Sequence, residues 1–244
     1  MTQPVIFLDD GGVMNDNLQR GMQWPPLVAE FFVPRLGGTA DAWAEANRIV
    51  ITRTLELEAW SARLRAAANY IDFDRTYQYD WLHAMCMCVG VSTPAKGESI
   101  ELAHQAEAYI IRRVHSAFPG AIDAIHTLHN SGYTLHTASG ESSFSLVGYL
   151  EGMGVRNCFG RLYGPDLIDS FKESPAYYER IFIDSGIAPS TALIVDDSPL
   201  AISWATKVGA RTVLINSTQH NECGATLCIR SLAELPGVIG QFHS

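Results

Sequence analysis

The chain has 244 residues, of which 47% are hydrophobic and 18% are charged, so it can bury the core of one domain with an insertion or of two small domains. Its net charge of -9 argues against nucleic acid and against an anionic membrane surface as main partners, because no basic stripe supplies the attraction. No apolar run approaches the ~20 residues that would span a bilayer, so we expect no membrane association.

The N-terminus passes directly from Met1 into an apolar run, without the features of a signal peptide. The five cysteines show neither the spacing of a disulfide framework nor that of a zinc site. We therefore expect a cytoplasmic protein whose thiols are reduced. The sequence leaves the oligomeric state open.

The first predicted element is a strand over residues 5–8, an apolar run of the length typical of a buried parallel strand. A polar, glycine-rich loop follows over residues 11–17. From about residue 23 to residue 115, apolar residues recur at helical spacing without strand alternation. Helices are expected within this block over residues 40–68, 77–89 and 99–118, with proline and glycine residues between them.

From residue 119 onward, helices and strands are expected to alternate. The expected helices cover residues 121–130, 142–152, 175–185 and 199–208, and the expected strands cover residues 133–137, 158–162, 192–195 and 211–215. This order predicts an α/β fold, a Rossmann-like doubly wound parallel sheet with right-handed crossovers. The first strand belongs to the same sheet, so the helical block is an insertion. We expect a core domain formed by residues 1–16 and 116–244 and an inserted α-helical cap domain formed by residues 17–115.

Two adjacent pairs of acids close two of these strands. Asp9 and Asp10 follow the first strand, and Asp196 and Asp197 follow the strand over residues 192–195. Ligand sites of open α/β sheets lie beyond the carboxyl ends of the strands. If the two strands are neighbours, up to four carboxylates crowd a small volume. Such crowding favours a cation, and an all-oxygen site suits Mg²⁺.

Four short segments stand in order at the ends of predicted strands or the start of a helix. They are Asp9-Asp10-Gly11-Gly12-Val13, Thr137-Ala138-Ser139, Lys172-Glu173-Ser174-Pro175 and Asp196-Asp197-Ser198. In these segments the chain resembles the haloacid dehalogenase (HAD) superfamily of hydrolases with an aspartate nucleophile. The family's first motif is Asp-x-Asp-Gly-Thr, followed by a Ser or Thr, a Lys and a downstream acidic pair. The resemblance covers residues 4–16 and 119–215.

The resemblance implies a role for each segment. Asp9 would be the nucleophile. Thr137 and the backbone N–H of Ala138 would hold the non-reacting oxygens of the substrate. Gly12 would also belong to the substrate-binding residues. Lys172 would offset the charge of nucleophile and substrate. Mg²⁺ would be held by Asp9, the backbone carbonyl of Gly11, Asp196 and Asp197.

The chain departs from the family's pattern at the first motif. The second aspartate of that motif, the general acid of the phosphatase branch, is replaced by Gly11, and the usual threonine is Val13. Loss of general acid catalysis typically costs ~10²–10⁴ in rate unless another group replaces it. Asp10 and Asp16 are the nearest acids that could supply the proton.

We expect a Mg²⁺-dependent hydrolase that acts on a small phosphorylated or phosphonylated metabolite. The first alternative is a metal-independent 2-haloacid dehalogenase, since that branch of the family also lacks the second acid. The second alternative is a non-catalytic binding protein that kept the fold after losing the acid at Gly11.

Overall fold

The structure is a computed structural model that describes residues 3–215 and 224–242. The chain divides into two compact units. We call the first, Met1–Asn17 with His115–Ser244, the core unit, and the second, Leu18–Val114, the helical unit.

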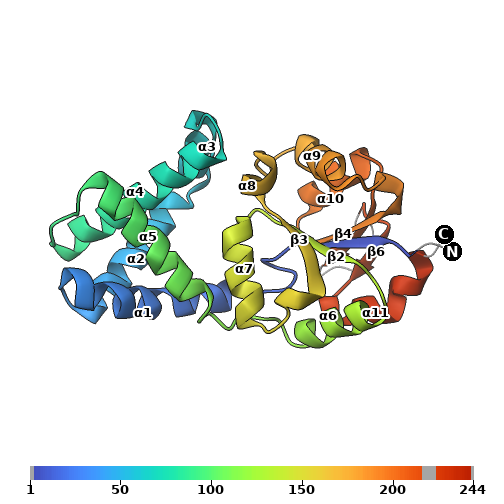
Figure 1. The fold of residues 1–244 in the computed structure, drawn as a ribbon, viewed down its shortest axis with the longest axis horizontal. Helices are drawn as coiled ribbons and strands as arrows, with labels where there is room; N and C mark the ends of the chain where they lie inside the picture. Colours follow the sequence, from blue (N-terminus) through green and yellow to red (C-terminus); the bar gives the residue numbers. More distant parts are fainter. Residues whose placement is uncertain (1–2, 216–223, 243–244) are drawn as a thin grey trace. The chain divides into compact units, whose positions relative to one another are not determined.

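A six-stranded parallel sheet organises the core unit (Figure 1). Its strands are β1 (Val5–Leu8), β2 (Leu135–Ala138), β3 (Phe159–Tyr163), β4 (Ala192–Asp196), β5 (Arg211–Ile215) and β6 (Leu227–Ile229). They lie in the order β3-β2-β1-β4-β5-β6, so β1 pairs with β2 on one side and with β4 on the other. The predicted α/β fold with a doubly wound parallel sheet is therefore confirmed.

Both faces of the sheet are covered, as parallel sheets require. Successive side chains of β1 point to opposite faces: Ile6 and Leu8 enter one buried cluster, and Phe7 enters the other. The first face packs against α6 (Ala121–Asn130), α7 (Ser143–Gly152) and α11 (Leu235–Val238). The second face packs against α8 (Pro165–Ile168), α9 (Pro175–Ser185) and α10 (Pro199–Lys207). Short 3-10 turns cover Arg156–Cys158, Pro189–Thr191, Leu232–Glu234 and Ile239–Phe242.

The helical unit is an insertion between β1 and α6. Its helices are α1 (Asn17–Leu36), α2 (Ala40–Thr54), α3 (Leu57–Ala66), α4 (Tyr70–Val89) and α5 (Lys96–Ile111). An aromatic cluster forms much of its core. The rings of Phe32 and Trp43 stack with centroids 4.8 Å apart, and Trp81 packs edge-on against Phe32 at 5.9 Å.

The chain leaves and re-enters the core unit through two short segments that pair with each other. Asn15 and Ala117 form an antiparallel bridge, and the N–H of Asp16 donates to the carbonyl of Ser116 at 2.7 Å. The N–H of Phe118 donates to the carbonyl of Met14 at 3.0 Å. These bonds hold the loop after β1 in place although about a hundred residues intervene.

Some expectations about elements and cysteines were wrong. The expected helix over residues 40–68 is two helices, α2 and α3, and α1 runs through Pro25 and Pro26, where we expected punctuation. Strand β6 was not expected. Cys86, Cys88 and Cys158 are free thiols, but Cys228 is disulfide-bonded, so the thiols are not all reduced.

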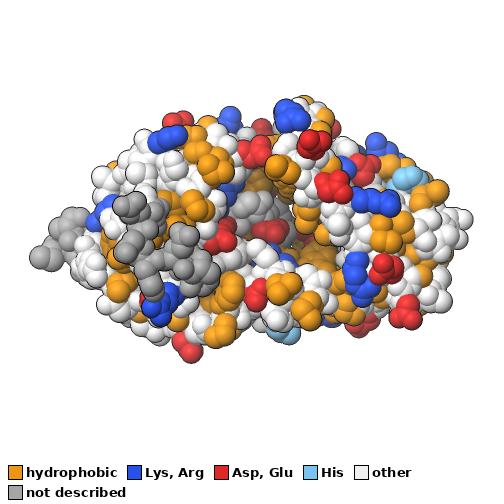
Figure 2. Space-filling model, turned by 180° about the vertical axis from the view of Figure 1, so that it is seen from behind, with side chains coloured by type: hydrophobic (Ala, Val, Ile, Leu, Met, Phe, Trp, Pro, Cys, Tyr) orange, Lys and Arg blue, Asp and Glu red, His pale blue; other side chains and the backbone are white. Residues whose placement is uncertain are grey.

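No helix among the described residues combines the length and the apolar character needed to cross a bilayer. Figure 2 shows one face of the molecule, on which basic, acidic and hydrophobic side chains of the described residues are interspersed.

Candidate active site

Three of the four predicted acids meet at the carboxyl ends of β1 and β4. The two strands are parallel neighbours with Leu8 opposite Val195, so Asp9 and Asp196 follow at the same edge of the sheet. The carboxylates of Asp9, Asp196 and Asp197 each offer an oxygen within 4.8 Å of the others. The register of β1 and β4 therefore produces the crowding that the sequence predicted, with one exception.

The exception is Asp10, whose carboxylate does not join this cluster. Its Oδ1 accepts a hydrogen bond of 2.7 Å from Nδ2 of Asn15, and Oδ1 of Asn15 accepts one of 2.9 Å from the hydroxyl of Ser116. All three side chains are buried. The carboxylate of Asp10 is therefore held within the loop after β1, where the chain bends. Of the up to four carboxylates that the sequence allowed here, three lie close together, and the contacts of Asp10 point to a structural role.

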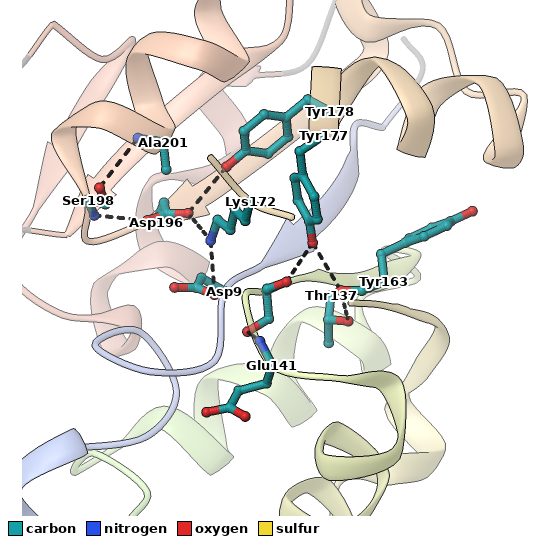
Figure 3. Close-up of polar contacts among 11 residues, drawn as sticks. Asp9, Thr137, Glu141, Tyr163, Lys172, Tyr177, Tyr178, Asp196, Ser198 and Ala201 are labelled. Carbon is teal, nitrogen blue, oxygen red and sulfur yellow. Dashed lines mark hydrogen bonds and ion pairs between the residues drawn. The ribbon is translucent and has the colours of Figure 1, made fainter. Parts of the chain in front are cut away.

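Lys172 joins two of the acids from the segment between α8 and α9. Its ammonium lies 3.0 Å from Oδ1 of Asp9 and 2.6 Å from Oδ2 of Asp196 (Figure 3). The Lys172 side chain is only 10% exposed. Burial by itself lowers the pKa of Lys172, but the carboxylates of Asp9 and Asp196 raise it more, and the net shift is upward. The ammonium is therefore held in its charged form between two acids.

Burial, and to a smaller extent neighbouring carboxylates, raise the energy of the charged forms of Asp9 and Asp197. Burial raises the pKa of Asp9 to about 6; the charge of Lys172 opposes this shift, and the charge of Asp196 adds to it. Partial burial raises the pKa of Asp197, and the neighbouring charge of Asp9 raises it further. A single ammonium therefore does not offset the negative charge gathered at this edge of the sheet, and a cation there would be stabilised.

The loop after β1 and Asp197 fit closely together. Gly12 has a φ of +83°, which favours glycine, and a Cβ at this position would lie 2.0 Å from Oδ2 of Asp197. Both oxygens of Asp196 have protein donors: Oδ1 accepts from the N–H of Ser198, and Oδ2 accepts from Lys172 and the Tyr178 hydroxyl. The donor set that could hold a hard divalent cation consists of carboxylate oxygens, with Asp9 and Asp197 less committed to protein donors than Asp196.

Thr137 and Ala138 lie beside this cluster at the end of β2. Thr137 pairs with Leu8, the residue before Asp9, and both Thr137 and Ala138 are fully buried. The hydroxyl of Thr137 donates to the carbonyl of Tyr163 at 3.2 Å (Figure 3). The structure therefore brings the second segment to the same edge of the sheet as Asp9. The role of Thr137 in holding a substrate stays a prediction.

Sequence reasoning missed three residues at the site. Tyr177 and Tyr178, adjacent on the first turn of α9, are fully buried, and Tyr178 donates to Asp196 at 3.4 Å. The third is Asn17, whose Oδ1 lies 2.5 Å from the position of a Cβ on Gly11. The tyrosines follow Lys172 by five and six residues, but Lys172 lies before α9 begins, so helical spacing does not relate them and gave no signal. Asn17 had no signal in its spacing.

Comparison with known proteins places this geometry in a family. A model of the haloacid dehalogenase-like hydrolases matches residues 28–209, about three quarters of the chain. The matched range includes Thr137, Lys172 and both downstream acids, and it begins after Asp9. No protein of curated function matches the chain.

Solved structures share the fold over nearly the whole chain. The 2-haloacid dehalogenase of Pseudomonas syringae pv. tomato DC3000 is 18% identical, with a TM-score of 0.65 and coverage of 99% of this chain and 100% of that one. The HAD-hydrolase YfnB of Bacillus subtilis, in a magnesium-bound structure, is also 18% identical, with a TM-score of 0.62 and coverage of 98% and 99%. A HAD phosphatase of Thermococcus onnurineus is 20% identical, with a TM-score of 0.59 and coverage of 98% of each chain. These likenesses concern the fold, and together with the match over residues 28–209 they lead to one conclusion: the chain belongs to the haloacid dehalogenase-like hydrolases.

Proposed function

We propose that this hydrolase is Mg²⁺-dependent and cleaves a small phosphorylated or phosphonylated substrate, with Asp9 as the nucleophile. The observation that carries the proposal is the cluster of Asp9, Asp196 and Asp197, whose oxygens lie within 4.8 Å of one another. Three acids with one ammonium leave excess negative charge, which a carboxylate-bearing substrate would increase. A divalent cation reverses that balance and makes the site suitable for a phosphoryl group.

The residues that would hold Mg²⁺ are Asp9, Asp197 and the backbone carbonyl of Gly11, with Asp196 next to them. When bound, the ion would neutralise charge on the phosphoryl oxygens. Lys172 already contacts Asp9 and Asp196, so we assign it the task of orienting the nucleophile and offsetting charge that develops during transfer.

In the proposed reaction, a carboxylate oxygen of Asp9 forms a bond to phosphorus while the bond from phosphorus to the leaving group breaks. The leaving group departs with the electron pair and takes up a proton. Water then attacks phosphorus, which releases phosphate and restores the Asp9 carboxylate. Since Gly11 has no side chain, the proton comes from water or from a group outside the first motif, and substrates with good leaving groups are favoured.

The test is to incubate the pure protein with Mg²⁺ and a panel of phosphate esters, phosphonates and anhydrides. We expect turnover that EDTA abolishes and that Asp9→Asn lowers at least about 10³-fold, as removal of a nucleophile does elsewhere. Equal rates in the wild type and Asp9→Asn across the panel would refute the proposal. Binding of Mg²⁺ and of a phosphoryl mimic without turnover would instead support a non-catalytic binding protein.

The absence of a side chain at Gly11 favours a second candidate, hydrolytic dehalogenation of a 2-halo acid. There Asp9 would attack carbon, halide would leave, and water would hydrolyse the resulting ester. The two candidates differ in their need for metal. Sustained chloride release from chloroacetate in excess EDTA would favour the dehalogenase, whereas turnover restored only by added Mg²⁺ would favour phosphoryl chemistry.

A further inference from the structure

The hydroxyl of Tyr177 lies at the centre of a small set of backbone carbonyls next to Thr137. It donates to the carbonyl of Ser139 at 2.7 Å and also faces the carbonyl of Tyr163 at 3.3 Å (Figure 3). Tyr177 is fully buried and Ser139 nearly so. Burying a phenol hydroxyl is costly unless it is hydrogen-bonded, so these two acceptors explain why a polar ring is tolerated in the apolar cluster on this face of the sheet.

The carbonyl of Tyr163 has more donors than it needs. It accepts from the N–H of Ser139 at 3.0 Å and from the hydroxyl of Thr137 at 3.2 Å, and the hydroxyl of Tyr177, whose one proton is shared with the closer Ser139 carbonyl, lies 3.3 Å away. A carbonyl oxygen offers two lone pairs. The Thr137 proton can therefore turn away without leaving this buried acceptor unsatisfied, because the N–H of Ser139 still donates to it.

Tyr177 is suited to act as a permanent donor. Burial raises the pKa of its phenol well above 10, and the nearby charge of Lys172 only partly opposes this shift. The phenol is therefore protonated at neutral pH. The hydrogen bond from Tyr177 orients the carbonyl of Ser139. Because the peptide that follows is planar and trans, the same bond orients that whole peptide.

We propose that Tyr177 is a positioning residue: its hydroxyl secures the turn after β2 and leaves the hydroxyl of Thr137 free to donate to a phosphoryl oxygen held at Asp9. Thr137 lies opposite Leu8, the residue directly before Asp9. The Thr137 hydroxyl is therefore placed to reach a phosphoryl oxygen held at Asp9. The inference rests on the proposed phosphoryl function. Tyr177 acts through Thr137 and the turn after β2, and not by contact with the substrate.

The test is a double-mutant cycle on the binding of orthophosphate in saturating Mg²⁺, measured by calorimetry for the wild type, Tyr177→Phe, Thr137→Val and the double variant. Loss of one hydrogen bond corresponds to about tenfold in affinity, so we expect Tyr177→Phe to weaken phosphate binding about tenfold. In the Thr137→Val background the same change should weaken it less than about twofold. Mg²⁺ affinity should stay unchanged in all four proteins, because the carboxylates are untouched.

Tyr133→Phe is the matched control, since it removes a hydroxyl from another buried tyrosine, just before the opposite end of β2. It should leave phosphate affinity unchanged. p-Aminophenylalanine at position 177 restores a hydrogen-bond donor and should restore most of the affinity for phosphate. If Tyr177→Phe does not fold, this variant takes its place in the comparison. Additive losses in the cycle, or equal losses in Tyr177→Phe and Tyr133→Phe, would overturn the inference.

Amide hydrogen exchange separates this inference from the proposed function. Tyr177→Phe should speed exchange at residues 139–141 relative to Tyr133→Phe, with no phosphate present. A wild type that binds no phosphate would count against the proposed function, and the exchange result would then decide the case of Tyr177. Unchanged exchange at residues 139–141 would overturn the positioning role.

Discussion

Among single residues, Asn17 bears most directly on the missing acid, because its amide lies where a side chain at position 11 would extend. Gly11 stands where the family's first motif has its second aspartate. The φ of Gly11 is not among the positive values, so its backbone does not forbid a side chain. The contacting atoms are the amide end of the flexible Asn17 side chain. The obstacle to an acid at position 11 is therefore this one side chain and not the backbone.

We therefore predict the effect of restoring that acid. Gly11→Asp combined with Asn17→Ala should raise turnover of alkyl phosphates at least about tenfold relative to aryl phosphates, because protonation matters most for poor leaving groups. Gly11→Asp alone should show a smaller gain, since Asn17 must first move. Steady-state rates on one alkyl and one aryl phosphate measure the ratio.

Asn17→Ala by itself is the control and should leave the ratio unchanged. An unchanged ratio in a folded, Mg²⁺-binding double variant would mean that another group already supplies the proton. Asp16 would then be the first residue to replace, because the carboxylate of Asp10 is held by Asn15.

The separation of Asp9 from Asp10 depends on the bend of the chain directly after β1 and on the amide of Asn15, which the sequence pattern does not record. That Asp9, Lys172 and the downstream acids lie close together could be predicted, because the carboxyl ends of parallel strands share one edge of the sheet. Their individual contacts could not. Neither could the contacts of Tyr177 and Asn17. They depend on which backbone carbonyls or loop atoms face a side chain after folding, and no spacing along the chain records that.

At the scale of elements, buried polar contacts hold together the two segments that join the core unit to the insertion. Asn15 links the carboxylate of Asp10 to the hydroxyl of Ser116. Asn15→Ala should lower the free energy of unfolding by about 1–3 kcal/mol, since it removes a donor from a buried carboxylate and an acceptor from a buried hydroxyl. Urea unfolding measures the loss. Asn130→Ala, at an exposed position at the end of α6, should change stability by less than about 0.5 kcal/mol. Equal effects of the two variants would contradict the argument.

An ion pair between His104 and Asp74 links α4 and α5. Nε2 of His104 lies 3.0 Å from Asp74, and Glu107 lies 3.8 Å from its Nδ1. Hydrogen bonds to Asp74 and then Glu107 raise the pKa of His104 from 6.5 to about 10, against the effect of burial. A raised histidine pKa stabilises the fold fully below the unfolded value near 6.5 and loses this effect as pH rises through about 10.

The free energy of unfolding of the wild type should therefore exceed that of His104→Gln most at pH 6, and the difference should shrink steadily toward pH 10. Denaturant unfolding at several pH values measures it, and 1 M salt should reduce the difference because the side chains are partly exposed. A difference that grows with pH would contradict the assignment.

The elements themselves were predictable where periodicity and end signals agree, as in the strand Arg211–Ile215 and the helix Pro175–Ser185. They were not where signals conflict. Pro25 and Pro26 suggested a boundary, yet α1 continues through them, because packing of residues such as Phe31 and Phe32 outweighs the lost backbone bonds. The break between α2 and α3 left no trace in the apolar spacing, since it falls at exposed residues.

At the scale of the whole molecule, the acids, Lys172 and Thr137 all belong to the core unit, and the helical unit contributes none of them. Asp9 and Asp196 lie at the ends of two adjacent central strands, β1 and β4. A ligand that binds these carboxylates only in the folded state must therefore stabilise the sheet of the core unit. The excess negative charge of the site makes a divalent cation the ligand with the largest expected effect.

We predict that Mg²⁺ at a hundred times its Kd stabilises the core unit by about 2.7 kcal/mol and leaves the helical unit unchanged. Hydrogen exchange followed by mass spectrometry should show slower exchange in β1 and β4 with Mg²⁺ and equal rates in α1 to α5. Asp197→Asn is the matched variant, because Lys172 pairs with Asp9 and Asp196 and so the ion pairs survive the change. It should lose most of the protection while keeping its stability in EDTA. Equal protection in the wild type and Asp197→Asn, or protection spread over both units, would show that the cation acts elsewhere than on these carboxylates.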